Sequence, residues 1–177
     1  MSYPPSFPSL TTERLTLRQL RFDDTNAIFR LRSSKEINKL ISRETPKTLN
    51  DAKAFIQVCH QEFEKEHRIF WAMQLENPKQ LIGTIVFHKI DLENKYAEVG
   101  SELNPDFQGN RFMSEAMKTV IEFGKTILKL KTIEAFTHQN NSASIALLEK
   151  HQFGLQPERR EKGFENNRIF RLEISQQ

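Results

Sequence analysis

Hydrophobic residues alternate with polar ones in several short segments, a pattern typical of half-buried β-strands. In 12–20, for example, Leu15 and Leu17 fall on one side of an extended chain and Arg14 and Arg18 on the other. This alternation, or a short run of apolar and β-branched residues, predicts seven strands at about 12–20, 70–75, 81–87, 96–103, 133–137, 155–161 and 169–174.

Apolar residues recur every three or four positions in four other segments, which predicts amphipathic helices. Asp23 or Asp24 can cap the first helix, and Asn141 or Ser142 can start the last. The expected helices end near Leu31, span 49–65, run from Gly109 to about 130, and end near 151. Between the first two helices, 33–48 is polar and irregular.

The order of these elements predicts an α/β (α+β) fold. A meander of strands followed by a strand–helix–strand–helix unit gives a mixed sheet with helices on both faces. We expect a single domain over residues 10–177, preceded by a loose arm at 1–9 that contains three prolines. A ligand is expected near the carboxyl end of strand 96–103, where the chain turns into a helix.

The turn after that strand suggests an anion site. Asn104-Pro105-Asp106 ends the strand, and Gly109 stands where the helical spacing begins. A helix N-terminus carries free backbone N–H groups, and a glycine beside it lets a phosphate approach the main chain. The sequence contains neither a P-loop nor a Gly-x-Gly-x-x-Gly fingerprint, so two common nucleotide folds are not indicated.

The segment Asn104-Pro-Asp-Phe-Gln-Gly-Asn-Arg-Phe-Met-Ser-Glu-Ala116 resembles the acetyl-coenzyme A loop of the GNAT superfamily of N-acetyltransferases. It is most similar to the ribosomal-protein-alanine N-acetyltransferase group, and the similarity extends from about Leu10 to Ile174. Further matching segments are Thr12-Glu-Arg-Leu-Thr-Leu-Arg18, Ile82-Gly83, Ala97-Glu-Val-Gly100 and Asn141–Phe153. Arg111 and Gln152 stand where the family usually has glycine.

The resemblance implies a mostly antiparallel GNAT-like sheet whose fourth and fifth strands splay apart. It also implies that acetyl-CoA lies in that splay, with its pyrophosphate on the helix start. The cofactor-binding residues that it implies are Leu103, Gln108, Gly109, Asn110, Arg111, Phe112, Met113 and Asn141.

Acetyl transfer to an amine needs a proton donor for the leaving thiolate and a route for the proton of the amine. The resemblance implies Ser144 as the donor, because Leu148 occupies the position where many GNAT enzymes have a tyrosine. It implies Glu98 as the base, although Glu98 could instead pair with a lysine such as Lys89 or Lys95. Glu102, His138 and bare water remain alternative bases.

The resemblance favours direct acetyl transfer, in a ternary complex, to a protein N-terminal α-amine. A small amine, such as a polyamine, an amino sugar or an antibiotic, is the alternative acceptor. The 33–48 segment normally helps form the acceptor site in this superfamily. A GNAT-fold module that binds acyl-CoA without catalysis is a further alternative.

Composition narrows the remaining choices. The 26 basic and 23 acidic residues leave a charge of only +3, which does not call for nucleic acid. Cys59 is the single cysteine, so no internal disulfide is expected and a cytoplasmic location is favoured. We expect no signal peptide, membrane span or metal, and a monomer or homodimer.

Overall fold

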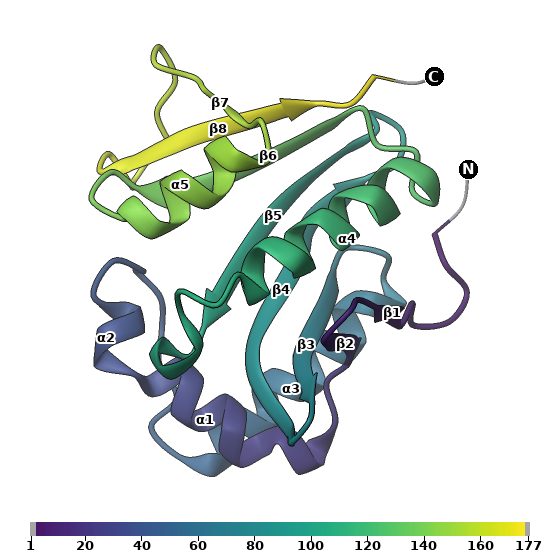
Figure 1. Ribbon diagram of the computed structural model, residues 1–177, viewed down its shortest axis with the longest axis vertical. Coiled ribbons are helices and arrows are strands. Elements are labelled where there is room, and N and C mark those ends of the chain that lie inside the picture. Colours follow the sequence, from purple (N-terminus) through teal and green to yellow (C-terminus); the bar gives the residue numbers. More distant parts are fainter. Residues whose placement is uncertain (1–2, 176–177) are drawn as a thin grey trace.

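The computed structural model describes residues 3–175 and contains one eight-stranded sheet (Figure 1). The strands lie in the order β1-β2-β3-β4-β5-β6-β8-β7, and every neighbouring pair is antiparallel except β5 and β6. Their bounds are β1 Leu10–Thr11, β2 Leu15–Gln19, β3 Ile69–Glu76, β4 Lys79–Asp91, β5 Tyr96–Leu103, β6 Thr132–His138, β7 Gly154–Leu155 and β8 Asn167–Glu173. The mixed, mostly antiparallel sheet is confirmed.

Helices cover both faces of the sheet (Figure 1). The larger core lies between the sheet and the helices α4 and α5, and it includes Trp71, Phe87 and Leu148. The smaller core lies under α1 and α3, around Ile56 and Phe70. The helical elements are η1 Phe22–Asp24, α1 Thr25–Ser33, α2 Lys35–Asn38, α3 Leu49–Glu64, η2 Pro105–Phe107, α4 Phe112–Thr126 and α5 Ser142–Lys150.

β5 and β6 separate after a short parallel contact. They pair only through Tyr96–Thr132, Ala97–Ile133 and Glu98–Glu134, although β5 continues to Leu103. The rest of β5 therefore has a free edge toward β6, and the two ribbons diverge there (Figure 1). This is the splay expected between the fourth and fifth predicted strands, since β1 is an additional two-residue strand at the sheet edge.

The N-terminal segment differs from the loose arm that the sequence predicts. Tyr3 is buried and donates a hydrogen bond to the carbonyl of Arg68. Phe7 packs against Phe63 and Trp71, and the indole N–H of Trp71 bonds to the Pro8 carbonyl at 2.7 Å. Aromatic packing thus holds this segment against the core, whereas its three prolines suggested a loose arm. Met1 and Ser2, the start of the expected arm, lie outside the described residues.

Two predicted elements end earlier than expected. The predicted strand 155–161 is wrong beyond Leu155: only Gly154 and Leu155 pair with β8, because Pro157 has no N–H to extend the ladder. The predicted helix to 130 stops at Thr126, and Lys129 adopts a left-handed conformation with φ 55°. The short helix α2 occupies part of the segment that was expected to be irregular.

Candidate active site

The loop between β5 and α4 is held in shape by its own polar groups. Asn104 accepts a hydrogen bond from the Asp106 amide at 3.1 Å. The Asn110 side chain donates to the Gln108 carbonyl at 3.1 Å. Arg14, the residue before β2, donates a hydrogen bond from Nη2 to the Asn110 carbonyl at 2.9 Å. Hydrogen bonds within the protein therefore determine the conformation of this loop.

The start of α4 leaves its first amides uncapped. Arg111 occupies the N-cap position with φ 65°, and its side chain makes no capping hydrogen bond. Gly109 has φ 76°, and an added Cβ there would meet nothing within 4 Å. Both facts favour an anion at this turn, because amides at a helix N-terminus attract negative charge and Gly109 leaves the approach open.

Glu115 fastens this helix start to the edge of the sheet. Its Oε1 accepts from the Thr12 hydroxyl at 2.5 Å and from the Arg14 amide at 2.8 Å, and its Oε2 accepts from Arg14 Nε at 2.9 Å. Burial opposes ionisation of Glu115, but these hydrogen bonds outweigh it and lower the pKa of the carboxyl. Arg14 also lies over the Phe112 ring, 4.2 Å from its centroid.

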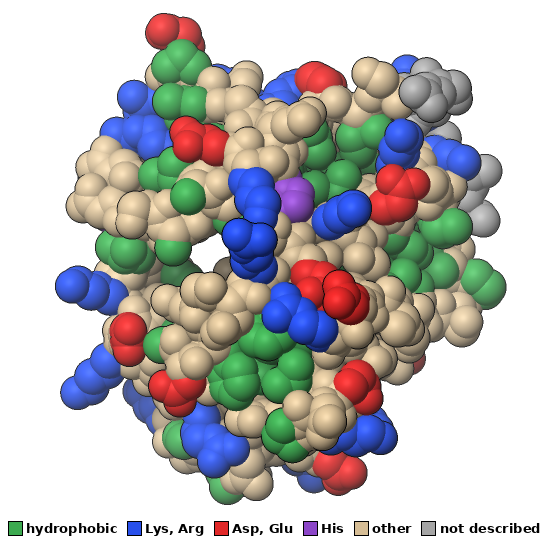
Figure 2. All heavy atoms as spheres, viewed as in Figure 1, with side chains coloured by type: hydrophobic (Ala, Val, Ile, Leu, Met, Phe, Trp, Pro, Cys, Tyr) green, Lys and Arg blue, Asp and Glu red, His purple; other side chains and the backbone are tan. Residues whose placement is uncertain are grey.

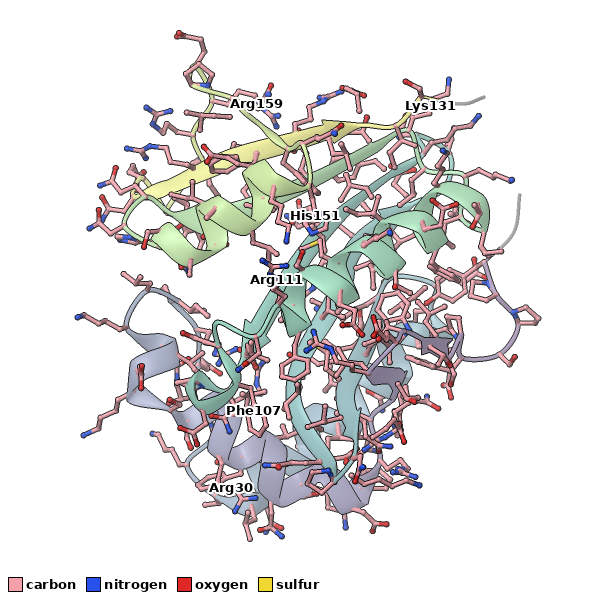
Figure 3. All side chains as sticks on the ribbon, in the orientation of Figure 1. Arg30, Phe107, Arg111, Lys131, His151 and Arg159 are labelled. Carbon is pink, nitrogen blue, oxygen red and sulfur yellow. The ribbon has the colours of Figure 1, made fainter. Side chains whose placement is uncertain are left out.

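Among the other expected cofactor residues, Gln108 and Asn110 are exposed on the loop, whereas Phe112 is buried. Met113 and Leu103 are half-buried and pack against the core under α4. Figure 3 shows Arg111 at the start of α4, on the side of α5. These residues from β5, the loop and α4 therefore form one continuous region.

The start of α5 supplies Asn141 and Ser144. Asn141 caps the helix, since its side-chain oxygen accepts from the Ser144 amide at 3.1 Å. Ser144 lies in the first turn and is half-buried. Leu148, where a tyrosine was noted as missing, points into the core that α5 shares with α4. His151 bonds to Ser114 at 3.0 Å and so links the two helices.

Glu98 lies on the opposite face of the sheet, where the splay closes. Its Oε1 accepts from Lys89 Nζ at 2.8 Å and from the Tyr96 hydroxyl at 3.2 Å. The pairing with Lys89 was the alternative weighed for this residue, and it is present. Glu98 and Ser144 are thus on different faces, because Ala97 and Val99 face the α4 core and Glu98 alternates with them.

Glu134 extends this polar cluster across to β6. It is buried, it accepts from Tyr96 at 3.1 Å, and it forms a two-point pair with Arg159. Burial opposes ionisation of Glu134, but the hydrogen bonds from Arg159 and Tyr96 outweigh it and lower the pKa. A cavity of about 450 Å³ lies beside Glu98 and is lined also by Arg68, His88 and Lys89.

The alternative bases occupy different places. Glu102 is buried on the part of β5 that does not pair with β6, in an ion pair with Arg43. His138 ends β6, and its Nδ1 accepts from the Asn140 amide at 3.1 Å, so the neutral ring carries its proton on Nε2. His138 also lines a second cavity, of about 420 Å³, between the α2 segment and the loop before β8. Figure 2 shows an opening between these parts of the surface.

Three contributors were not foreseen: Arg43, Arg14 and Glu115. Each acts through a partner far along the chain, and no local pattern in the sequence marks such a pair. Cys59 is buried, and burial raises the pKa of its thiol to about 12, so this thiol is not activated as a nucleophile. Among residues 3–175, no cluster of three His, Cys, Asp or Glu side chains could hold a metal, and no helix is long and apolar enough to cross a bilayer.

Comparison with known proteins gives the same architecture. The solved ribosomal-protein-S5-alanine acetyltransferase from Vibrio fischeri superposes with a TM-score of 0.81 at 17% identity, covering 94% of this chain and 96% of that one. The microcin C7 self-immunity acetyltransferase MccE, solved with acetyl-CoA and AMP, gives a TM-score of 0.78 at 20% identity, covering 92% and 93%. At these identities the similarity concerns the fold.

Sequence comparison reaches further than the fold. The chain is 35% identical over 147 residues to the uncharacterized N-acetyltransferase YoaA of Bacillus subtilis (strain 168), covering 83% of each protein. Residues 14–154 match the family described as the acetyltransferase (GNAT) domain. The chain therefore belongs to the GNAT acetyltransferase family and is an acyltransferase.

Proposed function

We propose that the protein transfers an acetyl group from acetyl-CoA directly to a protein N-terminal α-amine, within a ternary complex. The observation that carries the proposal is the uncapped start of α4 beside the free edge of β5. Enzymes of this family use acetyl-CoA. The start of α4 can bind its pyrophosphate, and the free edge of β5 can border its pantetheine arm. The fold that the chain shares with a ribosomal-protein alanine acetyltransferase supports the choice of acceptor.

The pyrophosphate of acetyl-CoA is assigned to the amides from Gln108 to Met113, with Gly109 giving it access to the main chain. Arg111 is exposed at this turn and adds positive charge beside the phosphates. Leu103 and Asn141 would border the pantetheine arm on its way into the splay, Leu103 from the end of β5 and Asn141 from the start of α5.

The chemistry needs one proton donor and one proton acceptor. The neutral amine attacks the thioester carbonyl, a C–N bond forms, and the C–S bond breaks. The Ser144 hydroxyl hydrogen-bonds to the departing thiolate from the α5 side and passes it a proton that Ser144 regains from water. Glu98 takes the proton of the amine through water from the other face; its Oε1 is occupied by Lys89 and Tyr96, which leaves Oε2 for the water.

A small amine is the second candidate acceptor. The cavity beside His138, of about 420 Å³, is within the size range of sites for small molecules. MccE, described as a self-immunity acetyltransferase, shares the fold. A cavity of this size does not by itself exclude a peptide terminus, so an acceptor screen decides between the two.

The test measures CoA release from acetyl-CoA with peptides that differ in their first residue and with small amines. CoA affinity is measured in parallel for Gly109→Val, where a side chain would obstruct the phosphates, and for Gly163→Val as a control. Gly163 also has a positive φ and open surroundings, but it lies in the loop before β8; it lines the cavity beside His138, which the CoA measurement, made without acceptor, does not involve. We expect Gly109→Val alone to lose CoA affinity. Equal affinities in the two folded variants would contradict the assigned phosphate site.

The same assay tests the two catalytic assignments. A general acid or base contributes about 10²–10⁴-fold, and Ser144→Ala should fall at or below the lower end, because a serine helps only by a positioned hydrogen bond. Glu98→Gln should lower the rate most at low pH, where the amine is largely protonated. Equal pH profiles for Glu98→Gln and the parent would remove Glu98 as the base. Tight CoA binding without turnover of any amine would instead indicate a non-catalytic module.

A further inference from the structure

Glu102 and Arg43 form the least satisfied ion pair of the protein. Glu102 lies on β5 and Arg43 in the segment between α2 and α3, and their side chains are only 6% and 15% exposed. Among the described residues 3–175, two buried side-chain polar atoms have no hydrogen-bond partner, namely Nη2 of Arg43 and Oε1 of Glu102. Both unsatisfied atoms therefore belong to this one pair.

Two other arginine–carboxylate pairs of the described residues are made differently. Arg18 holds Asp24 through two parallel bonds of 2.8 Å, and Arg159 holds Glu134 by the same two-point arrangement. Such two-point pairs use both terminal nitrogens and both carboxylate oxygens. Arg43 contacts Glu102 through Nη1 and Oε2 alone. Leaving the two remaining atoms buried and unpaired costs free energy, so the arrangement calls for a partner that is absent from the free protein.

Neighbouring residues hold Arg43 in this end-on position. Its Nε donates to Asn38 Oδ1 at 2.8 Å, and the Asn38 amide donates to the Arg32 carbonyl at 2.7 Å. Arg32 itself is stacked on Phe55, 3.8 Å from the ring centroid, and its Nη1 comes no nearer than 3.9 Å to Oε1 of Glu102. Oε1 thus has a positive charge nearby but no donor within hydrogen-bond distance.

The pair also stands where an acceptor would arrive. Glu102 follows Glu98, the last residue of β5 that pairs with β6, so it lies on the open part of the splay. Glu98, Gly100 and Glu102 share one face of the strand, and the His88 ring packs against Gly100, with its Nε2 3.3 Å from where a Cβ would stand. Asn38, which positions Arg43, lines the cavity of about 420 Å³. The cavity therefore borders the residue that holds Arg43 in place, although neither Arg43 nor Glu102 lines it.

We propose that Glu102 and Arg43 bind the acceptor by its amine and by a carbonyl oxygen on the adjacent carbon. Oε1 accepts a hydrogen bond from the amine, and Nη2 donates one to the carbonyl. An α-amine followed by a carbonyl, as in a peptide N-terminus or an amino-acid amide, presents this donor and this acceptor on neighbouring carbons. A polyamine offers no carbonyl, and it leaves Nη2 unpaired. The inference rests on the proposed acetyl transfer and deepens it.

One trapped water could also satisfy both atoms, since a buried water bridges polar groups in this way. The two explanations differ in one measurable property. A water contributes to stability whatever the acceptor is, whereas recognition of a carbonyl makes the rate depend on whether the acceptor has one.

The experiment compares kcat/KM for two acceptors, alaninamide, which carries that carbonyl in its carboxamide group, and ethylamine, which lacks the carboxamide, in the parent and in variants. The comparison between proteins uses the ratio of the two values, so the different basicity of the amines cancels. Arg43→Lys keeps the charge beside Glu102 but replaces the two terminal nitrogens by one, so no nitrogen stands at the Nη2 position, and it should reduce the preference for alaninamide about tenfold or more. Arg43→Gln should do the same if it folds.

Glu102→Gln should raise KM for both acceptors and leave KM for acetyl-CoA unchanged, because the amine is common to both. Arg18→Gln is the matched control: it breaks a buried pair with Asp24 away from the cavity, and it should lower thermal stability without changing the ratio. A parent ratio near one, or a ratio that Arg43→Lys leaves unchanged, would overturn the inference and favour the trapped water. No turnover of any amine would instead defeat the proposed transfer, and this inference with it.

Discussion

At the scale of single residues, the two departures from the family's glycine pattern have one explanation. Arg111 and Gln152 both adopt left-handed backbone conformations, with φ 65° and φ 67°. Glycine reaches this region without penalty, whereas another residue there is held at a cost of about 1 kcal/mol or more. The chain thus keeps the backbone that glycine would favour and places a side chain on it. Sequence alone indicated the substitution but could not show that the turn survives it.

Replacing Arg111 separates the backbone from the charge. Arg111→Gly should raise the melting temperature, because it relieves the left-handed strain at the N-cap, whereas Arg111→Ala should not. Both variants should weaken CoA binding, more at low salt than at high salt, because both remove the charge. Thermal melts and titration calorimetry with CoA at two salt concentrations measure these effects. Unchanged affinity in both variants would show that only the Arg111 amide matters.

At the scale of elements, the local pattern of apolar residues predicted the strands and helices that pack against a core. The strand 96–103 has the predicted bounds, because Ala97 and Val99 face the α4 core and polar residues alternate with them on the other face. The last hairpin does not: 155–161 is rich in charge, and Arg159 leaves the ladder to pair with Glu134 on β6. Tyr3 and Phe7 likewise became part of the core through contacts with residues more than fifty positions away. The spacing of apolar residues along the sequence does not indicate contacts between residues so far apart.

The approach of β4 to β5 depends on Gly83. A Cβ there would lie 2.5 Å from the Glu102 carbonyl oxygen and 3.1 Å from a Leu103 side-chain carbon. Gly83→Ala must push β5 away and should destabilise the protein by about 1–3 kcal/mol, the usual range for overpacking. It should also raise KM for the acceptor, because Glu102 moves with its strand.

Gly154→Ala is the control for Gly83→Ala. Gly154 also lies in a strand, but its added Cβ would meet the Arg171 carbonyl at 3.9 Å, an ordinary contact. We expect little change in its denaturation midpoint or in its kinetics. If Gly83→Ala were as stable as Gly154→Ala in urea titrations, the tight packing of β4 on β5 would not limit stability.

At the scale of the whole molecule, the sequence predicted the elements that form the candidate site but not the ion pairs that hold them. The loop at 104–113, the helix start at 141 and the strand 96–103 were all expected, and the fold brings them to one splay. The residues that fix them were not: Arg14 and Glu115 are 101 positions apart, and Arg43 and Glu102 are 59 apart. A charged residue in sequence shows its sign but not its partner, so these pairs needed the tertiary structure.

Buried charges also determine how the molecule responds to acid. Asp24 is buried, and its burial opposes ionisation, but hydrogen bonds from Arg18 and from the Arg21 amide outweigh burial and lower its pKa. Glu134 behaves in the same way. A carboxyl with a lowered pKa stabilises the fold above its unfolded pKa, near 4, and that stability is lost as the pH falls further. The stabilisation from these two carboxyl groups is therefore lost only below about pH 4.

His88 changes the stability of the fold over a separate and less acidic range of pH. Burial on the β4 face, together with the charges of Arg68, Lys89 and Arg32, lowers its pKa to about 4. The unfolded chain protonates this histidine near 6.5, so between about 6.5 and 4 the unfolded state binds the extra proton. Stability should therefore fall as the pH drops through that window. We expect His88→Gln to lose less stability than the parent between pH 7 and pH 5 in urea titrations. An NMR titration that shows His88 protonating above pH 6 would contradict this assignment, because the folded pKa would then match the unfolded one.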